Sequence, residues 1–182
     1  MIKIRPAISS DSATLSKLAE KTFRETFSHE NTIDDMDDYC ANNYSEAIQS
    51  SELANSGYYT FVAENEQIEE NKKLVAYTQI KWDSIPSNME LEHPAEIKRI
   101  YIEKHYHGKG LAQKLMFQCL SKMKENNVQT AWLGVWENNF RAITFYKKTG
   151  FTEIGEHIFT LGKDKQRDII LALNLEEWEQ QR

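Results

Sequence analysis

The sequence predicts an α/β domain in which helices flank a mixed, mostly antiparallel sheet. A short apolar strand, Ile97 to Ile102, leads through a glycine loop into a long amphipathic helix that begins at Leu111. A second strand–helix unit runs from Thr130 to Gly150. Two pairs of neighbouring strand-like segments add antiparallel hairpins: 58–63 with 74–82, and 152–161 with 168–175.

The first half of the chain reads as one strand, two helices and two further strands. Alternation over Met1 to Arg5 ends at Pro6 and predicts the first strand. Asp11 or Ser12 can cap a helix that continues to Phe27. A second helical stretch is expected over 34–49, and its first turn is rich in Asp34, Asp35, Asp37 and Asp38. Acids favour a helix N-terminus, and they could equally form a negative rim for a basic amine.

The second half alternates strands with helices and closes with a hairpin. Segment 83–95 has two prolines and no clear period, so it is expected to be a loop that forms a substrate wall. The helix after the glycine loop should end in a left-handed cap at Asn126–Asn127, and the helix 140–148 at Gly150. The last two strands are expected around a turn at 162–165. The predicted order is β-α-α-β-β-β-α-β-α-β-β, as a single domain over 1–182.

Composition restricts the class of protein. No apolar run is long enough to cross a membrane and no signal sequence is visible, so a cytoplasmic protein without membrane contact is expected. Cys40 and Cys119 are too few for a disulfide framework or a zinc site, and no metal is expected. A net charge of −6 argues against nucleic acid as a partner and is compatible with a cationic substrate.

The glycine loop is a candidate phosphate-binding site; its sequence is His107-Gly108-Lys109-Gly110-Leu111-Ala112. It delivers unpaired main-chain N–H groups and the positive end of a helix dipole, and its glycines allow close approach. It is not a P-loop, which needs four residues between its glycines and a Ser or Thr after the Gly-Lys pair. Nor is it a dinucleotide fingerprint, because Gln113 stands where a third Gly or Ala is required.

Two spaced motifs resemble those of the GCN5-related N-acetyltransferase (GNAT) family. The family pattern Gln/Arg-x-x-Gly-x-Gly/Ala is matched by His107, Gly110 and Ala112, with His in place of Gln or Arg. A following pattern, Asn-x-x-Ala-Ile-x-x-Tyr-x-x-x-Gly-Phe, is matched at six positions: Asn139, Ala142, Ile143, Tyr146, Gly150 and Phe151. Within the family, the sequence is most similar to the bacterial Pai-type spermidine/spermine acetyltransferases. The resemblance covers nearly the whole chain.

The resemblance implies acetyl-coenzyme A (acetyl-CoA) as cofactor, with coenzyme A as product. Its pyrophosphate would lie on the glycine loop, and its pantetheine arm along Ile100, Tyr101 and Ile102 by strand addition. A main-chain N–H of that strand would polarise the thioester carbonyl. Asn139 would bind the pantetheine amides, and it could also simply cap the helix that follows it. His107 is a weaker phosphate partner than a guanidinium. Tyr146 would act as the acid that protonates the departing thiolate, although it could instead be a packed aromatic.

The sequence indicates the acceptor substrate less directly than it indicates the cofactor. The resemblance implies a primary amine, such as a polyamine, that attacks directly in a ternary complex. An alkyl ammonium has a pKa of about 10 and needs a base. Glu96 is the expected one, Glu137 is a second candidate, and either could be an exposed carboxylate at a strand end. His29 lies between the first two helices, where the family often lines its acceptor site, and reads more simply as a loop residue.

Three readings of the function remain open from the sequence. The chain could acetylate a small cationic amine, or the N-terminus or a lysine of a protein. It could also bind acetyl-CoA without turnover, as a regulatory module. A homodimer is a further expectation, because the apolar last strand and Trp178 could join a partner.

Overall fold

The computed structural model describes residues 1–69, 73–161 and 164–178, and its strands form one seven-stranded sheet with the order β1-β2-β3-β4-β5-β7-β6. The strands are β1 (Ile2–Pro6), β2 (Tyr58–Asn65), β3 (Leu74–Trp82), β4 (Pro94–Ile102), β5 (Thr130–Trp136), β6 (Thr152–Leu161) and β7 (Asp164–Asn174). The α-helices are α1 (Ser12–Phe27), α2 (Ile33–Tyr44), α3 (Glu46–Ala54), α4 (Leu111–Glu125) and α5 (Phe140–Thr149). The predicted fold class is confirmed.

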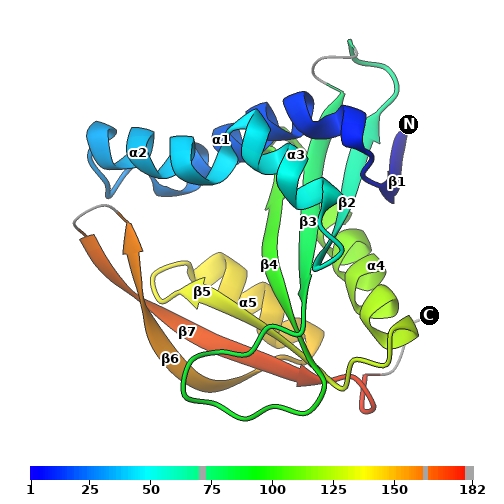
Figure 1. Ribbon diagram of the computed structural model, residues 1–182, viewed down its shortest axis with the longest axis vertical. Helices are drawn as coiled ribbons and strands as arrows, with labels where there is room; N and C mark the ends of the chain where they lie inside the picture. The colour runs from blue at the N-terminus through cyan, green and yellow to red at the C-terminus, as the bar shows by residue number, and fades with distance from the viewer. Residues whose placement is uncertain (70–72, 162–163, 179–182) are drawn as a thin grey trace.

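The sheet is antiparallel except where β4 meets β5. That parallel pair is short, since it is formed only by Pro94, Ala95 and Glu96 with residues 130–132. Beyond Glu96 the two strands separate, and Figure 1 shows β4 and β5 running apart. The register of β4 against β3 skips Lys98, which marks a β-bulge just past the last parallel pair. A bulge bends and twists its strand, so it accounts for the divergence.

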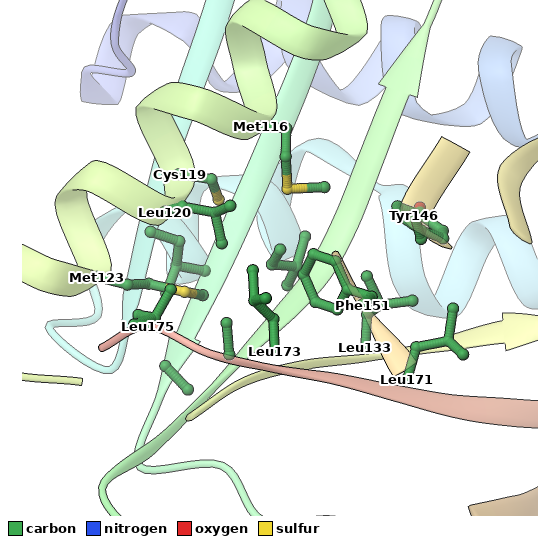
Figure 2. Packing of buried hydrophobic residues seen from close by; sticks show 14 of the residues in the cluster. Met116, Cys119, Leu120, Met123, Leu133, Tyr146, Phe151, Leu171, Leu173 and Leu175 are labelled. Carbon is green, nitrogen blue, oxygen red and sulfur yellow. The ribbon is translucent and has the colours of Figure 1, made fainter. Parts of the chain in front are cut away.

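Helices cover both faces of the sheet. On one face, α1 and α2 pack their apolar side chains against β2 and β3. On the other face, α4 buries the predicted stripe: Leu111, Leu115, Met116, Cys119, Leu120 and Met123. Figure 2 shows four residues of this stripe (Met116, Cys119, Leu120 and Met123) in one cluster with Leu173 of β7, Leu175 and Phe151. The predicted left-handed positions are confirmed at Asn127 (φ 59°) and Gly150 (φ 106°).

The predicted helix over 34–49 is wrong, because the structure has two helices there. α2 ends at Tyr44 and α3 begins at Glu46, with Ser45 between them in an extended conformation (ψ 154°). Serine is a favoured residue just before a helix, and its side chain competes with helical hydrogen bonds inside one. The order is therefore β-α-α-α-β-β-β-α-β-α-β-β. The four acids at 34–38 lie at the start of α2, where Asp37 pairs with Arg24 at 2.7 Å.

The C-terminal hairpin also differs from its prediction. β7 starts at Asp164 and not at residue 168. The additional residues, 164–167, pair with β6 as well. Of the predicted turn at 162–165, residues 162 and 163 lie outside the described part of the chain. Since β7 lies between β5 and β6, it is not a free edge to which a partner subunit could add.

Candidate active site

The divergence of β4 and β5 leaves a cavity of about 800 Å³. It is lined by most of the residues that the sequence analysis assigned to cofactor and catalysis: Glu96, Ile100, Tyr101, Ile102, His107, Gly108, Gly110, Leu111, Ala112, Asn139 and Tyr146. Three of the predicted or candidate residues do not line it: Lys109, Glu137 and His29. The ammonium of Lys109 instead lies over the Tyr106 ring, 5.4 Å from its centroid.

The glycine loop has the geometry that an anion site requires. Gly108 and Gly110 have φ values of 73° and 76°, in the left-handed region that residues other than glycine adopt only at a cost in free energy. A Cβ at either position would have no atom within 4 Å, so the loop surface is open. Gly110 caps α4, and the N–H of Lys114 makes the first bond of the helix, to the Gly110 carbonyl at 3.2 Å. The main-chain N–H groups of residues 111–113 are therefore available to phosphate oxygens.

Arg141 offsets the weakness expected of His107. The Nη1 of Arg141 lies 3.0 Å from His107 Nδ1, and His107 Nε2 lies 2.7 Å from the Ile102 carbonyl oxygen. These distances fit a neutral imidazole that donates through Nε2–H and accepts the arginine N–H at Nδ1. The guanidinium of α5 thus stands beside the glycine loop and supplies the cation that the family's Gln/Arg position lacks here.

The open edge of β4 presents Ile100 and Ile102. The N–H of Glu103 donates to Val75 of β3 at 2.9 Å, so the main chains of residues 103 and 101 face β3. Because strand residues alternate, the N–H and C=O groups of Ile100 and Ile102 face away from β3, toward the cavity. Tyr101 contributes its ring, which meets Phe23 of α1 at 6.5 Å, and not its main chain. The predicted strand addition of the pantetheine arm can therefore use the main chains of Ile100 and Ile102, and not that of Tyr101.

Tyr146 lies where α5 meets the core. Its side chain is 8% exposed, and Figure 2 shows it at the margin of the apolar cluster, beyond Phe151. Within the described residues, its hydroxyl has no hydrogen-bond partner, although the ring lines the cavity. Burial raises the pKa of Tyr146, so the phenol keeps its proton at neutral pH. Asn139 caps α5 by accepting the Ala142 N–H at 3.2 Å, which confirms the capping role predicted for it.

The two candidate bases differ in position. Glu96 lines the cavity, and its Oε2 accepts a hydrogen bond from Ser84 Oγ at 2.7 Å. Glu137 forms an ion pair with Arg167 at 2.8 Å outside the cavity. The predicted substrate wall over 83–95 is not found, because no residue of this segment lines the cavity; Met89 and Leu91 pack against Trp132 instead.

Aromatic rings form a further part of the cavity wall. They come from five elements: Phe23 and Phe27 of α1, Tyr39 of α2, Tyr101 of β4, Trp136 of β5 and Phe159 of β6. Successive rings touch, with centroids 4.7 Å apart for Phe23 and Tyr39, and 5.7 Å apart for Tyr39 and Phe159. We refer to these six residues as the aromatic chamber. The four acids at the start of α2 do not line the cavity.

Comparison with known proteins decides the family. Residues 14–151, which include the glycine loop and the whole of the Asn139–Phe151 motif, match the Acetyltransferase (GNAT) family. The chain belongs to the GNAT family. This acetyltransferase therefore uses acetyl-CoA, and the expected cofactor and enzyme class are confirmed.

Relatives of this acetyltransferase carry several names. An uncharacterized N-acetyltransferase from the pepI 3′ region of Lactobacillus delbrueckii subsp. lactis is 28% identical over 170 residues, 93% of this chain and 95% of that protein. A protein named "Probable spermine N(1)-acetyltransferase" from Bacillus subtilis subsp. natto is 36% identical over 61 residues, 33% of this chain and 40% of that protein. The [ribosomal protein bS18]-alanine N-acetyltransferase of Escherichia coli K12 is 27% identical over 113 residues, 60% and 70% of the two chains.

The fold of the acetyltransferase has solved counterparts. The PaiA N-acetyltransferase from Thermoplasma acidophilum, solved in complex with coenzyme A, superposes with a TM-score of 0.75 at 20% identity, over 96% of this chain and 99% of that one. At this identity the similarity establishes the fold. Among the described residues of the acetyltransferase, no helix is long and apolar enough to span a membrane.

Sequence reasoning missed two groups in this site. Arg141 stands two residues after Asn139, at a position that the second motif leaves variable, so the motif gave it no role. The aromatic chamber was partly visible, because Phe23 and Phe27 lie on the apolar side of the first predicted helix. Nothing in their spacing indicated that they would meet rings from β4, β5 and β6.

Proposed function

We propose that this acetyltransferase transfers the acetyl group of acetyl-CoA to a primary amine of a small organic cation, with polyamines such as spermidine and spermine as the first class. One observation carries the proposal. A single cavity joins the glycine loop and the open β4 edge to the aromatic chamber, so that both substrates can meet in it. Direct attack in a ternary complex requires this proximity.

The cofactor half of the cavity suits acetyl-CoA. The N–H groups of residues 111–113 and the Arg141 guanidinium would hold the pyrophosphate, and Ile100 and Ile102 would hold the pantetheine amides. When bound, the thioester supplies the activated acetyl group. The Ile100 N–H would donate toward the carbonyl oxygen, and the Tyr146 hydroxyl would give its proton to the leaving sulfur.

The acceptor half suits an organic cation. Ammonium groups are attracted to aromatic faces, with about 0.5–2 kcal/mol per contact. Three carboxylates line the cavity as well: Glu25, Glu96 and Asp168. The relative named for spermine acetylation supports a polyamine, whereas the relative that acetylates an alanine N-terminus supports a peptide.

A panel of acceptors tests the proposal. Thiol release from acetyl-CoA is measured with spermidine, spermine, other small amines, a lysine peptide and a peptide with an N-terminal alanine. Turnover with the polyamines at the highest kcat/KM supports the proposal. A higher kcat/KM with a peptide would indicate instead that the enzyme acetylates proteins. Tight acetyl-CoA binding without thiol release on any acceptor would indicate a binding module.

Arg141→Ala is expected to raise the Kd for coenzyme A roughly tenfold, because a charge-assisted contact to phosphate is lost. The effect should shrink at high salt, since Arg141 is exposed and salt screens its charge. Calorimetric titration of coenzyme A at two salt concentrations measures both the change in Kd and its dependence on salt. Lys147→Ala removes an exposed cation from the same helix outside the cavity and serves as the control. Equal affinity in the two variants would remove Arg141 from the phosphate site.

Trp136→Leu is expected to raise the KM for spermidine roughly fivefold, because leucine keeps an apolar wall and removes the aromatic face. The KM for acetyl-CoA should stay the same, since Trp136 lies at the acceptor end. Trp178→Leu changes a tryptophan that packs on Phe117 outside this cavity, and it is the control. An unchanged KM for spermidine in Trp136→Leu would contradict cation recognition by the aromatic chamber.

Glu96 is one candidate for the base. It lines the cavity, and one of its carboxylate oxygens accepts a hydrogen bond from Ser84 while the other has no hydrogen-bond partner among the described residues. Glu137 is the weaker of the two predicted carboxylates, because it does not line the cavity and is paired with Arg167.

A further inference from the structure

A histidine and an aspartate face each other across the last two strands, inside the cavity. His157 of β6 and Asp168 of β7 form a direct cross-strand pair, and His157 Nε2 lies 3.7 Å from Asp168 Oδ2. The side chain of Asp168 is 14% exposed and that of His157 31%. Both side chains line the cavity. None of the roles assigned above to acetyl-CoA binding or to proton donation uses either residue.

The strand beneath the pair leaves room for it. A Cβ at Gly134 of β5 would lie 3.3 Å from His157 Cε1 and 3.5 Å from Asp168 Oδ2. A methyl group there would crowd the imidazole and touch the carboxylate, so the glycine leaves space for both groups against β5. Gly134 and Trp136 are two residues apart and therefore share a sheet face. His157 and Asp168 thus stand at the aromatic chamber, on the acceptor side.

A ring contact also places this part of β6 beside the aromatic chamber. Burial raises the pKa of Tyr39, a chamber residue of α2, and the charge of Asp168 adds to that rise. Phe159, two residues after His157 on β6, packs against the same Tyr39 ring at 5.7 Å. The pair is therefore held between β5 and α2, at the place where an amine recognised by the chamber would lie.

The proposed reaction needs a proton acceptor at that place. An alkyl ammonium has no lone pair, and its pKa of about 10 keeps it protonated at neutral pH. Imidazole is suited to remove such a proton, because it changes charge near neutral pH. Resting on the function proposed above, we infer that His157 accepts the proton of the acceptor amine and that Asp168 stabilises the imidazolium that results.

The proton balance of this step is complete. An N–H bond of the ammonium breaks, its proton moves to an imidazole nitrogen of His157, and the electron pair stays on the amine nitrogen. That pair forms the new C–N bond while the C–S bond breaks, and the sulfur takes the proton of Tyr146. The acylated nitrogen loses a second proton, which restores the phenol through solvent. His157 releases its proton to water, so one proton leaves per turnover.

The fall of kcat/KM at acid pH should reflect the titration of the pair formed by His157 and Asp168. Burial raises the pKa of Asp168 to about 6, and attraction to His157 opposes the rise. Below this pH, protonation removes the carboxylate that would stabilise the imidazolium. The cavity wall holds other titratable groups from α1, α2, β4, the segment after β4, and α5: Glu25, Tyr39, Tyr44, Glu96, Lys98, Arg99, Tyr101, Lys104, Tyr106, His107, Arg141 and Tyr146. Glu156 and Glu137 pair with Arg167, which neighbours Asp168 and points to the opposite face of its strand.

The test is the pH profile of kcat/KM for the best amine of the acceptor panel. His157→Gln is expected to lower the neutral plateau roughly tenfold to a hundredfold and to leave the Kd for coenzyme A unchanged. Asp168→Asn should lower the plateau and move the acid limb to lower pH, because the imidazolium loses its partner. A purely structural role would not move the limb. His93→Gln, an exposed histidine outside the cavity, is the control.

Two results would overturn the inference. One is a His157→Gln variant with the plateau and the acid limb of the wild type. The other is Glu96→Gln abolishing the acid limb while His157→Gln keeps it, which would return the role to Glu96. Either result is distinct from failure of the proposed function, in which the wild-type enzyme itself would acetylate no small amine.

Discussion

The Tyr146→Phe variant is expected to turn over roughly 10²-fold to 10³-fold more slowly with its best amine and to bind acetyl-CoA almost as tightly as the wild type. Tyr146 lines the cavity, and its hydroxyl has no hydrogen-bond partner in the described part of the protein and a pKa that burial raises. It therefore carries its proton until the leaving thiolate needs one. Phenylalanine keeps the ring that packs against Phe151, with centroids 6.0 Å apart.

Rapid-mixing kinetics of thiol release and calorimetric titration of coenzyme A measure the two quantities separately. Tyr58→Phe removes a phenol hydroxyl at the start of β2, outside the cavity, and should leave both unchanged. A folded Tyr146→Phe variant with the kcat of the wild type would exclude this residue as the acid. Loss of coenzyme A binding in step with kcat would assign it to binding.

The Glu52→Ala variant is expected to lose about 3–5 kcal/mol of unfolding free energy, because it leaves a buried arginine without its carboxylate. Arg99 of β4 is 6% exposed, and its guanidinium bonds Glu52 of α3. Gln79 Nε2 and Lys98 Nζ also donate to that carboxylate, at 3.1 and 3.0 Å. The cluster holds the bulge of β4 against α3, so its loss should also disturb the open edge.

Urea unfolding at neutral pH measures the loss, and Glu46→Ala, an exposed acid of the same helix, should change the free energy by less than about 0.5 kcal/mol. Burial acts to raise the pKa of Glu52, but Arg99 and Lys98 outweigh it and lower that pKa. Its contribution to stability is therefore present above the ordinary glutamate pKa and lost as pH falls through the lowered value. Equal stability of the two variants at neutral pH would contradict this role for the cluster.

The sequence by itself determined the local elements and the cofactor chemistry. Strand alternation, the α4 stripe, and the caps at Asn139, Asn127 and Gly150 depend on contacts within a few residues, so their spacing is written in the chain. The glycine loop and the motif from Asn139 to Phe151 are local for the same reason, and together they were sufficient to indicate acetyl-CoA. The boundary between α2 and α3 was predicted wrongly although its signal is also local, because Ser45 is favoured just before a helix and disfavoured inside one.

Only the tertiary structure revealed the contacts between distant segments on which the proposed site depends. Arg141 reaches His107 across 34 positions of sequence, and the aromatic chamber takes rings from five elements. His157 and Asp168 meet because the β6–β7 register places them opposite each other, over a glycine of a third strand. The divergence that opens the cavity follows from a bulge seen only in the pairing of β3 with β4. Such contacts depend on strand register and on packing between distant segments, which the periodicity of a single segment does not encode.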